Sequence, residues 1–189
     1  MQPVSETADR YDRRTMWLHW ATALLVASQW VIAQIIDDFE GAARVDARSV
    51  HITLGLILIA VLATRIVWRA TQGRRLPAAD RGALHAVAKG THWAMYLLLI
   101  AAVTLGVANV WVRGDSIYNL FRIPAFDPGN KPLRTQVEDL HGLAANSILI
   151  LAGIHASAAL VHRYVWRDGV LARMLPRRVG SRASEHPKP

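Results

Sequence analysis

Residues 49–68 read SVHITLGLILIAVLATRIVW, an apolar run without proline that carries His51 near its start and Arg65 near its end. A run of about 20 residues rises about 30 Å as an α-helix, which is the thickness of the hydrocarbon core of a bilayer. Similar runs occupy residues 16–36, 93–112 and 143–165. We therefore predict an all-α protein, an integral membrane four-helix bundle made of these four spans.

The composition supports a membrane protein, because 52% of the 189 residues are hydrophobic and only 19% are charged. Helices in the core of a soluble protein would each show a polar face, whereas these runs contain scattered polar residues such as His, Thr, Ser and Gln, and only two charged ones, Arg65 and Arg163. The first run is too long for the apolar part of a cleaved signal peptide, and it contains His19. We predict one membrane domain over residues 1–176 and a disordered basic tail over residues 177–189.

The net charge of +8 is distributed unevenly along the chain. Lys and Arg gather in the N-terminal tail, between the second and third runs, and in the C-terminal segment, which four spans place on one side of the membrane. Since basic segments stay inside, both termini are predicted to be cytoplasmic. The charge then serves topology and contact with anionic membrane lipid, and we expect no nucleic-acid partner.

The histidines are the most informative polar residues, because ionisable side chains at membrane depth usually face the bundle interior and serve a function. Seven of the eight histidines lie in or beside the runs. They are His19, His51, His85, His92, His141, His155 and His162.

Depth sorts four of these histidines into two pairs on different helices. His155 follows His141 by 14 residues, so it lies about 21 Å deeper and only about 40° away around the same helix. His51 then matches the depth of His141 on the outer side, and His19 matches that of His155 on the inner side. Each pair is able to hold one haem iron from both faces. The absence of cysteine excludes thiolate ligands and c-type haem.

Small neighbours give a second criterion, because a haem plane against a helix needs space one turn from its ligand. The residues four positions after the paired histidines are Ala23, Gly55, Ala145 and Ala159, whereas Lys89, Tyr96 and Trp166 follow His85, His92 and His162. A zinc or iron site remains open as an alternative. Such a site usually includes carboxylates, and here the carboxylates near histidines are at span ends, notably Glu138 and Asp139.

Several motifs resemble the bacterial cytochrome b-561 family over roughly residues 10–178. They are Trp17-Leu18-His19-Trp20, His51-x-x-x-Gly55, Arg65-x-x-Trp68-Arg69, His92-x-x-x-Tyr96-Leu97-Leu98, His141 near the start of the fourth span, and Gly153-Ile154-His155-Ala156. The resemblance implies two haem b groups with His19, His51, His141 and His155 as axial ligands. It also implies quinone-linked electron transfer in the bacterial inner membrane. Some relatives are superoxide:quinone oxidoreductases, and others are cytochrome subunits of dehydrogenases or hydrogenases.

Three further residues are candidates with two readings each. Arg65 either extends to the lipid headgroups or contacts a propionate of the inner haem. His92 and His162 lie near the cytoplasmic face, where each either binds a quinone or makes a hydrogen bond at a helix end.

The outer loop over residues 113–139 is long and contains the turn sequence Asp127-Pro128-Gly129. Residues 116–121 are a candidate cover over the outer haem, lying on the membrane surface. The loop carries basic residues that would attract a small anion such as superoxide, although nearby acidic residues weaken this reading. These basic residues are Arg113, Arg122, Lys131 and Arg134.

The sequence therefore predicts a membrane dihaem b-type cytochrome that carries single electrons between ubiquinone or another quinone and a donor or acceptor at the outer face. Superoxide or a periplasmic redox protein is the expected outer partner. An anchor subunit of a periplasmic dehydrogenase or hydrogenase, without a substrate site of its own, is the alternative. A histidine-lined metal transporter is the third hypothesis.

Overall fold

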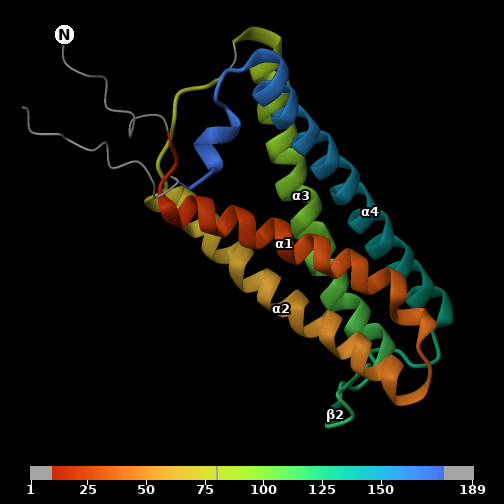
Figure 1. The fold of residues 1–189 in the computed structure, drawn as a ribbon. Coiled ribbons are helices and arrows are strands. Elements are labelled where there is room, and N and C mark those ends of the chain that lie inside the picture. The colour runs from red at the N-terminus through yellow and green to blue at the C-terminus, as the bar shows by residue number, and fades with distance from the viewer. Residues whose placement is uncertain (1–9, 80, 177–189) are drawn as a thin grey trace, which may run out of the picture.

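The computed structural model describes residues 10–79 and 81–176, and four long helices make up most of it. These are α1 (Arg13–Ile35), α2 (Gly41–Thr71), α3 (Gly82–Arg113) and α4 (Lys131–Val161) (Figure 1). Short helices follow at η2 (Ile36–Asp38), η3 (His162–Trp166, a π-helical turn) and η4 (Leu171–Met174). All four long helices are long and apolar enough to cross a membrane. The predicted all-α four-span architecture is confirmed, while the predicted tail over residues 177–189 lies outside the described residues.

Local capping explains why some helices begin before the predicted spans. The Asn130 side chain accepts a hydrogen bond from the Leu133 N–H at 3.0 Å, and Pro132 occupies the first turn, so α4 begins at Lys131. Residues 131–142, which were expected outside the spans, are therefore helical. Residues 41–48 and 82–92 are helical as well, although neither Glu40 nor Arg81 makes a side-chain cap there. At its other end α3 stops at Gly114, whose φ of 67° is left-handed. A Cβ on Gly114 would lie 2.9 Å from the Ala125 Cβ, so both the left-handed backbone and this close contact require glycine there.

The start of α1 is fixed by the Asp12 carboxylate. It accepts hydrogen bonds from the Thr15 N–H at 2.9 Å, from the Trp68 Nε1 at 3.1 Å and from the Arg74 N–H at 3.2 Å. Burial alone would raise the pKa of Asp12, but these hydrogen bonds outweigh it and lower the pKa to about 2. This single side chain therefore joins the start of α1 to the end of α2 and the segment after it.

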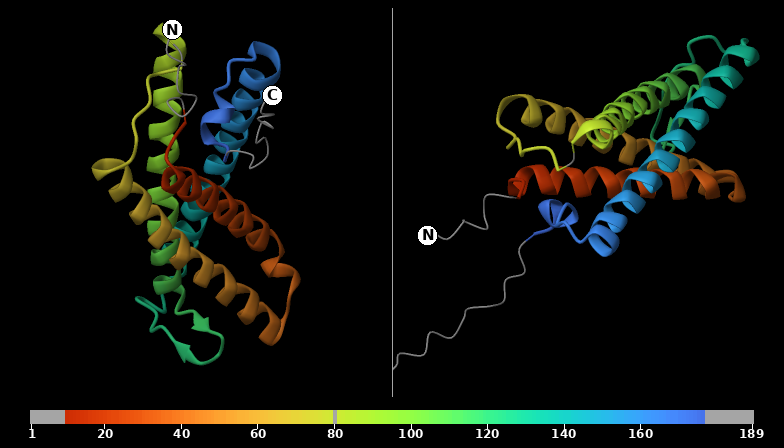
Figure 2. Two further views of the ribbon diagram at one scale, coloured as in Figure 1. Left: turned by 60° about the vertical axis from the view of Figure 1, so that its left-hand side comes forward. Right: turned by 90° about the horizontal axis from the view of Figure 1, so that it is seen from above.

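The helices form two antiparallel pairs, α1 with α2 and α3 with α4, and there is less contact between the pairs than within them. The pairs are inclined and cross each other (Figure 2), and in the view of Figure 1 they diverge toward the end where the described chain begins and finishes. We call this the terminal end. The segment around η4 lies between the pairs there: the Trp20 Nε1 donates to the Met174 carbonyl at 2.8 Å, and the Arg173 guanidinium donates to the Pro77 carbonyl at 2.9 Å.

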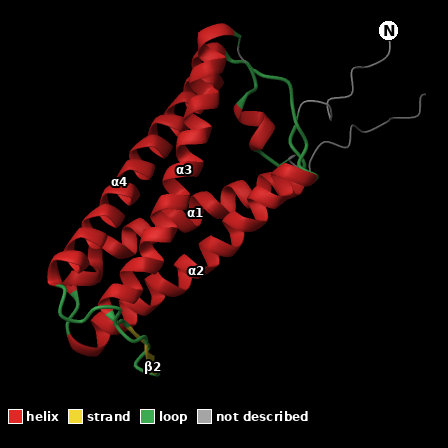
Figure 3. Ribbon diagram, turned by 180° about the vertical axis from the view of Figure 1, so that it is seen from behind, coloured by secondary structure: helices red, strands yellow, loops and turns green. Residues whose placement is uncertain are grey.

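A small antiparallel hairpin of β1 (Ser116–Ile117) and β2 (Phe121–Arg122) lies at the opposite end of the bundle, which we call the hairpin end (Figure 3). Sequence reasoning expected residues 116–121 to lie along the membrane surface and did not predict these strands. Ser49 of α2 holds the hairpin. Its fully buried hydroxyl accepts a hydrogen bond from the Tyr118 N–H at 2.8 Å and donates one to the Val45 carbonyl at 2.7 Å.

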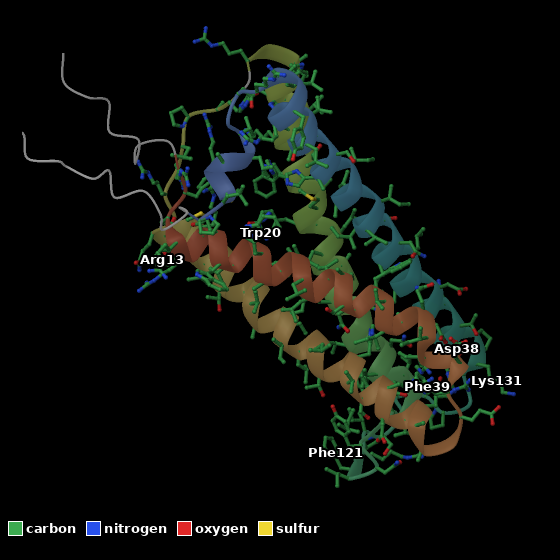
Figure 4. The ribbon with its side chains drawn as sticks, viewed as in Figure 1. Arg13, Trp20, Asp38, Phe39, Phe121 and Lys131 are labelled. Atoms are coloured by element: carbon green, nitrogen blue, oxygen red, sulfur yellow. The ribbon has the colours of Figure 1, made fainter. Side chains whose placement is uncertain are left out.

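The packed core is small, and many apolar side chains face outward (Figure 4). Leu58, Leu62, Leu99 and Ile148 are its buried centre. In contrast, Leu24 of α1 and Ile150 of α4 are 70% and 66% exposed. Exposed apolar side chains along helices of this length are the arrangement that lipid tails stabilise, because the backbone bonds are satisfied within each helix. The fold is that of a multi-pass membrane protein.

Candidate functional site

Two pairs of histidine rings face each other across the bundle. His51 of α2 and His141 of α4 form the hairpin-end pair, with ring centroids 6.3 Å apart and ring planes at 83°. His19 of α1 and His155 of α4 form the terminal-end pair, with centroids also 6.3 Å apart and planes at 71°. One helix serves both pairs, because 14 helical residues bring α4 back to nearly the same face after about 21 Å.

The spacing within each pair suits an ion held by both rings. A transition metal lies about 2 Å from an imidazole nitrogen, so an ion bound by two opposed rings sets their centroids about 6 Å apart. The measured 6.3 Å agrees with that value in both pairs. Two neutral imidazoles without thiolate or carboxylate are the donors that occupy both axial positions of a b-type haem iron. The residues present therefore fit haem.

His141 is oriented for binding through one particular nitrogen. Its Nδ1 lies 3.0 Å from the Ala102 carbonyl oxygen, which accepts only, so Nδ1 carries the proton and Nε2 keeps its lone pair. Gly106 lies against the same ring. A Cβ at position 106 would stand 3.1 Å from the His141 Cε1, so a side chain there would displace the imidazole. Both supports come from α3, one turn apart.

The surroundings of His51 contain two unpaired polar atoms. The His51 Nδ1 and the Gln29 Oε1 are buried, and neither has a hydrogen-bond partner among the described residues. Buried polar atoms are normally paired, so these two are available to a bound group. Gly55, one turn after His51, has its place for a Cβ only 2.9 Å from the Gln29 Nε2. The sequence predicts that Gly55 leaves space for a haem plane, and in the structure the absence of its Cβ leaves space for the Gln29 side chain of α1.

His155 has a second histidine neighbour at the terminal end. The rings of His92 and His155 are 5.3 Å apart at 68°, closer than the rings of His19 and His155. The sequence did not pair His92, because the bulky Tyr96 follows it by one turn. The structure therefore brings three of the predicted site histidines together, and His92 lies beside the terminal-end pair.

Arg65 contacts this same cluster. Its Nη2 lies 3.2 Å from the His19 Nδ1, and its guanidinium lies 5.3 Å from the centre of the Tyr96 ring. A guanidinium only donates, so the His19 Nδ1 accepts and a neutral His19 carries its proton on Nε2. His19 would offer the Nε2 lone pair to a haem iron only with its proton on Nδ1, and Nδ1 could then no longer accept from Arg65. Arg65 therefore faces the histidine cluster, and its contact with a propionate stays a prediction.

His162 makes different contacts from His92. It forms a short hydrogen bond with the Asp168 carboxylate and packs edge-on against Trp166, with ring centroids 4.5 Å apart. Burial would raise the pKa of Asp168, but hydrogen bonds from His162 and the Val170 N–H outweigh it and lower the pKa. The two histidines predicted as a quinone site therefore have separate surroundings.

The four basic residues that the sequence predicts to attract an anion differ in burial and in ion pairing. Arg113 is largely buried and forms ion pairs with Asp115 at 3.6 Å and with Glu138 at 3.1 Å, and Arg48 lies 3.4 Å from the same Asp115 carboxylate. The charge of Arg113 is therefore compensated. Arg122, Lys131 and Arg134 are exposed. The sequence could not show this, because the partners of Arg113 come from two separate segments.

Sequence reasoning missed the supports of the hairpin-end pair. Gly106 was the one support with a visible signal, because a glycine inside an apolar helical run often marks a close approach. The Ala102 carbonyl and the Ser49 hydroxyl gave no signal, since backbone acceptors and small hydroxyl residues are common in such runs.

Comparison with known proteins matches residues 10–177 to the prokaryotic cytochrome b561 family. The chain is 28% identical to the probable superoxide oxidase CybB of Yersinia pestis, over 90% of this chain and 98% of that protein. It is 27% identical to cytochrome b561 homolog 1 of Escherichia coli, over 90% and 99%. It is 29% identical to cytochrome b562 of Cereibacter sphaeroides, over 87% and 94%. The structure contains four spans and two histidine pairs, and the family match covers nearly the whole chain. The chain therefore belongs to the prokaryotic cytochrome b561 family, whose b-type character implies haem b.

Proposed function

We propose that this protein is a dihaem b-type cytochrome that carries single electrons across the bacterial inner membrane, between the quinone pool and a redox partner at the outer face. The observation that carries the proposal is the presence of two histidine pairs with the same 6.3 Å spacing, one toward each end of α4. Haem b supplies one-electron iron chemistry when bound. His51 with His141, and His19 with His155, are the proposed axial ligands.

The chain's own residues define what these sites can do. A haem held by both histidines of a pair would have no ligand position left for oxygen, which favours electron transfer over oxygen activation. The Ala102 carbonyl and Gly106 keep the His141 ring in its ligating orientation. Side chains of Leu58, Leu62, Leu99 and Ile148 pack between the helices and keep water out of the bundle centre.

The quinone is proposed to bind at the terminal end, which the distribution of Lys and Arg assigns to the cytoplasm. His92 is the principal candidate, because its ring lies 5.3 Å from that of His155 and is positioned to exchange a proton with a quinone oxygen. Arg65 and Tyr96 lie beside it and supply a guanidinium and a phenol. His162 is a separate second candidate at the same end.

Superoxide is the proposed outer donor, which the similarity to a probable superoxide oxidase supports. At the hairpin end, Arg122 and Lys131 offer exposed positive charge for a small anion. The anchor-subunit alternative is favoured by another observation, the exposed apolar tip of the hairpin, where Leu120 is 82% and Phe121 58% exposed. Such a tip would suit a protein partner at the outer face.

The third hypothesis, a metal transporter, has less support. Within the described ranges, no three His, Asp or Glu side chains come close enough together to hold a metal ion. The histidines lie in facing pairs at two depths, which suits a ligand inserted between two rings better than a compact ion cage.

The test is the reduction of a soluble ubiquinone analogue by the purified protein under a steady flux of superoxide. We expect quinol to form in proportion to the protein added, and haem reduction to precede it. A protein with reducible haem but no superoxide-driven quinone reduction would support the anchor subunit instead. A protein without b-type absorption would overturn both haem hypotheses.

A further inference from the structure

A hollow at the end of α4 is lined by basic and aromatic side chains. It has a volume of about 310 Å³, and its lining residues are Arg163, Tyr164 and Arg167. None of these three residues is a carboxylate. The hollow lies in and just after the π-helical turn η3, and none of its lining residues belongs to the cluster of His19, His92 and His155.

The backbone brings the two arginines to one place. The Arg167 N–H donates to the His162 carbonyl, which closes the π turn, and Arg167 itself has a left-handed φ of 55°. Arg163 and Arg167 line the same hollow, so their like charges repel each other. The nearest carboxylate in sequence, Asp168, is hydrogen-bonded to His162 and to the Val170 N–H. Among the described residues, no ion pair includes either arginine.

This position is where a membrane changes from lipid tails to headgroups. The apolar span continues as far as Trp166, and the side chains before it are exposed, Tyr164 by 70% and Val165 by 68%. Tyrosine and tryptophan concentrate at this depth because one part of the ring is apolar and another is polar. Along α4 below the hollow, Leu160 and Ile154 are 50% and 58% exposed and would contact acyl chains.

We propose that this hollow, the Arg163–Arg167 hollow, binds the phosphate of an anionic phospholipid. The two guanidiniums donate to the phosphate oxygens, the Tyr164 hydroxyl offers a further donor, and the acyl chains follow the apolar surface of α4. A bound phosphate also removes the repulsion between the arginines. Guanidinium forks match phosphate geometry. The exposed apolar side chains of α4 next to the hollow, among them Leu160 and Ile154, favour a phosphate that carries acyl chains over a carboxylate-bearing peptide.

The test measures binding of phosphatidylglycerol to the full-length haem-loaded protein in neutral detergent, by native mass spectrometry. The double variant Arg163→Gln/Arg167→Gln is compared with the wild type and with Arg81→Gln, which removes an exposed arginine at the same end but outside the hollow. Two surface arginines near a lipid headgroup change affinity by about thirtyfold. We therefore expect about thirtyfold weaker binding in the double variant and wild-type binding in Arg81→Gln.

Two further arms identify the source of the phosphate and keep the test decisive. Phosphatidylcholine should bind more weakly than phosphatidylglycerol, and millimolar inorganic phosphate should not displace the lipid. Unchanged phosphatidylglycerol binding in the double variant would overturn the proposal, and displacement by inorganic phosphate would assign the hollow to a free anion. If the double variant loses its haem spectrum, Arg163→Lys/Arg167→Lys replaces it, with intermediate lipid binding expected and unchanged binding again overturning the proposal.

Discussion

Replacing Ser49 by alanine should loosen the hairpin formed by β1 and β2. The Ser49 hydroxyl is fully buried and accepts the Tyr118 N–H at 2.8 Å, so Ser49→Ala leaves that part-buried amide without this partner. An unsatisfied buried donor costs about 1–3 kcal/mol. Since 1.4 kcal/mol is a factor of ten, local opening at Tyr118 should become about 5 to 150 times more frequent.

Hydrogen–deuterium exchange of the peptide that contains Tyr118 measures this opening directly. The matched control is Thr64→Ala in the same helix, whose hydroxyl donates only to the Ala60 carbonyl at 2.8 Å. We expect faster exchange at residues 116–122 in Ser49→Ala and wild-type exchange in Thr64→Ala. Equal exchange in all three proteins would refute the reasoning that one hydroxyl anchors the hairpin.

Three further perturbations test separate parts of the structure. Gly106→Ala should disturb the spectrum of one haem and not the other, because its Cβ would stand 3.1 Å from the His141 imidazole. The control is Gly90→Ala, whose Cβ would have nothing within 4 Å and which should leave both haem spectra unchanged. Asp12 has a pKa of about 2 in the folded protein, below its ordinary 3.8. The ionised carboxylate therefore stabilises the start of α1 above about pH 4, and this stabilisation is lost as the pH falls toward 2. Trp68 fluorescence should report an acid transition that Asp12→Asn lacks, and an identical pH profile in both proteins would contradict this. Arg65→Gln should lower the reduction potential of one haem by the order of 50 mV, since a nearby positive charge is lost; redox titration with both potentials unchanged would place Arg65 away from the haem.

Periodicity alone predicted the features that depend on a single helix. The 14-residue spacing of His141 and His155 places both on one face of α4, and the length of each apolar run gives a span. The pairing of His51 with His141 required only the topology of four spans. These steps succeed because helix geometry converts spacing into depth and direction.

Features that depend on how helices pack against each other could not be predicted from spacing. His92 lies beside His155 because of the rotation of α3 against α4, which no local pattern specifies. The early start of α4 follows from capping by Asn130, and the anchoring of the hairpin depends on the burial of one hydroxyl. The compensation of Arg113 by Asp115 and Glu138 likewise joins residues that only the tertiary structure brings together.

The central proposal is that each facing histidine pair holds one haem, and the haem-to-protein ratio tests it most directly. Extracted haem is quantified against protein for the wild type and for His51→Ala, His19→Ala and His92→Ala. We expect two haems per chain in the wild type and in His92→Ala, and one in each of the other two variants. One haem per chain in the wild type, or loss of a haem in His92→Ala with both retained in His19→Ala, would contradict it.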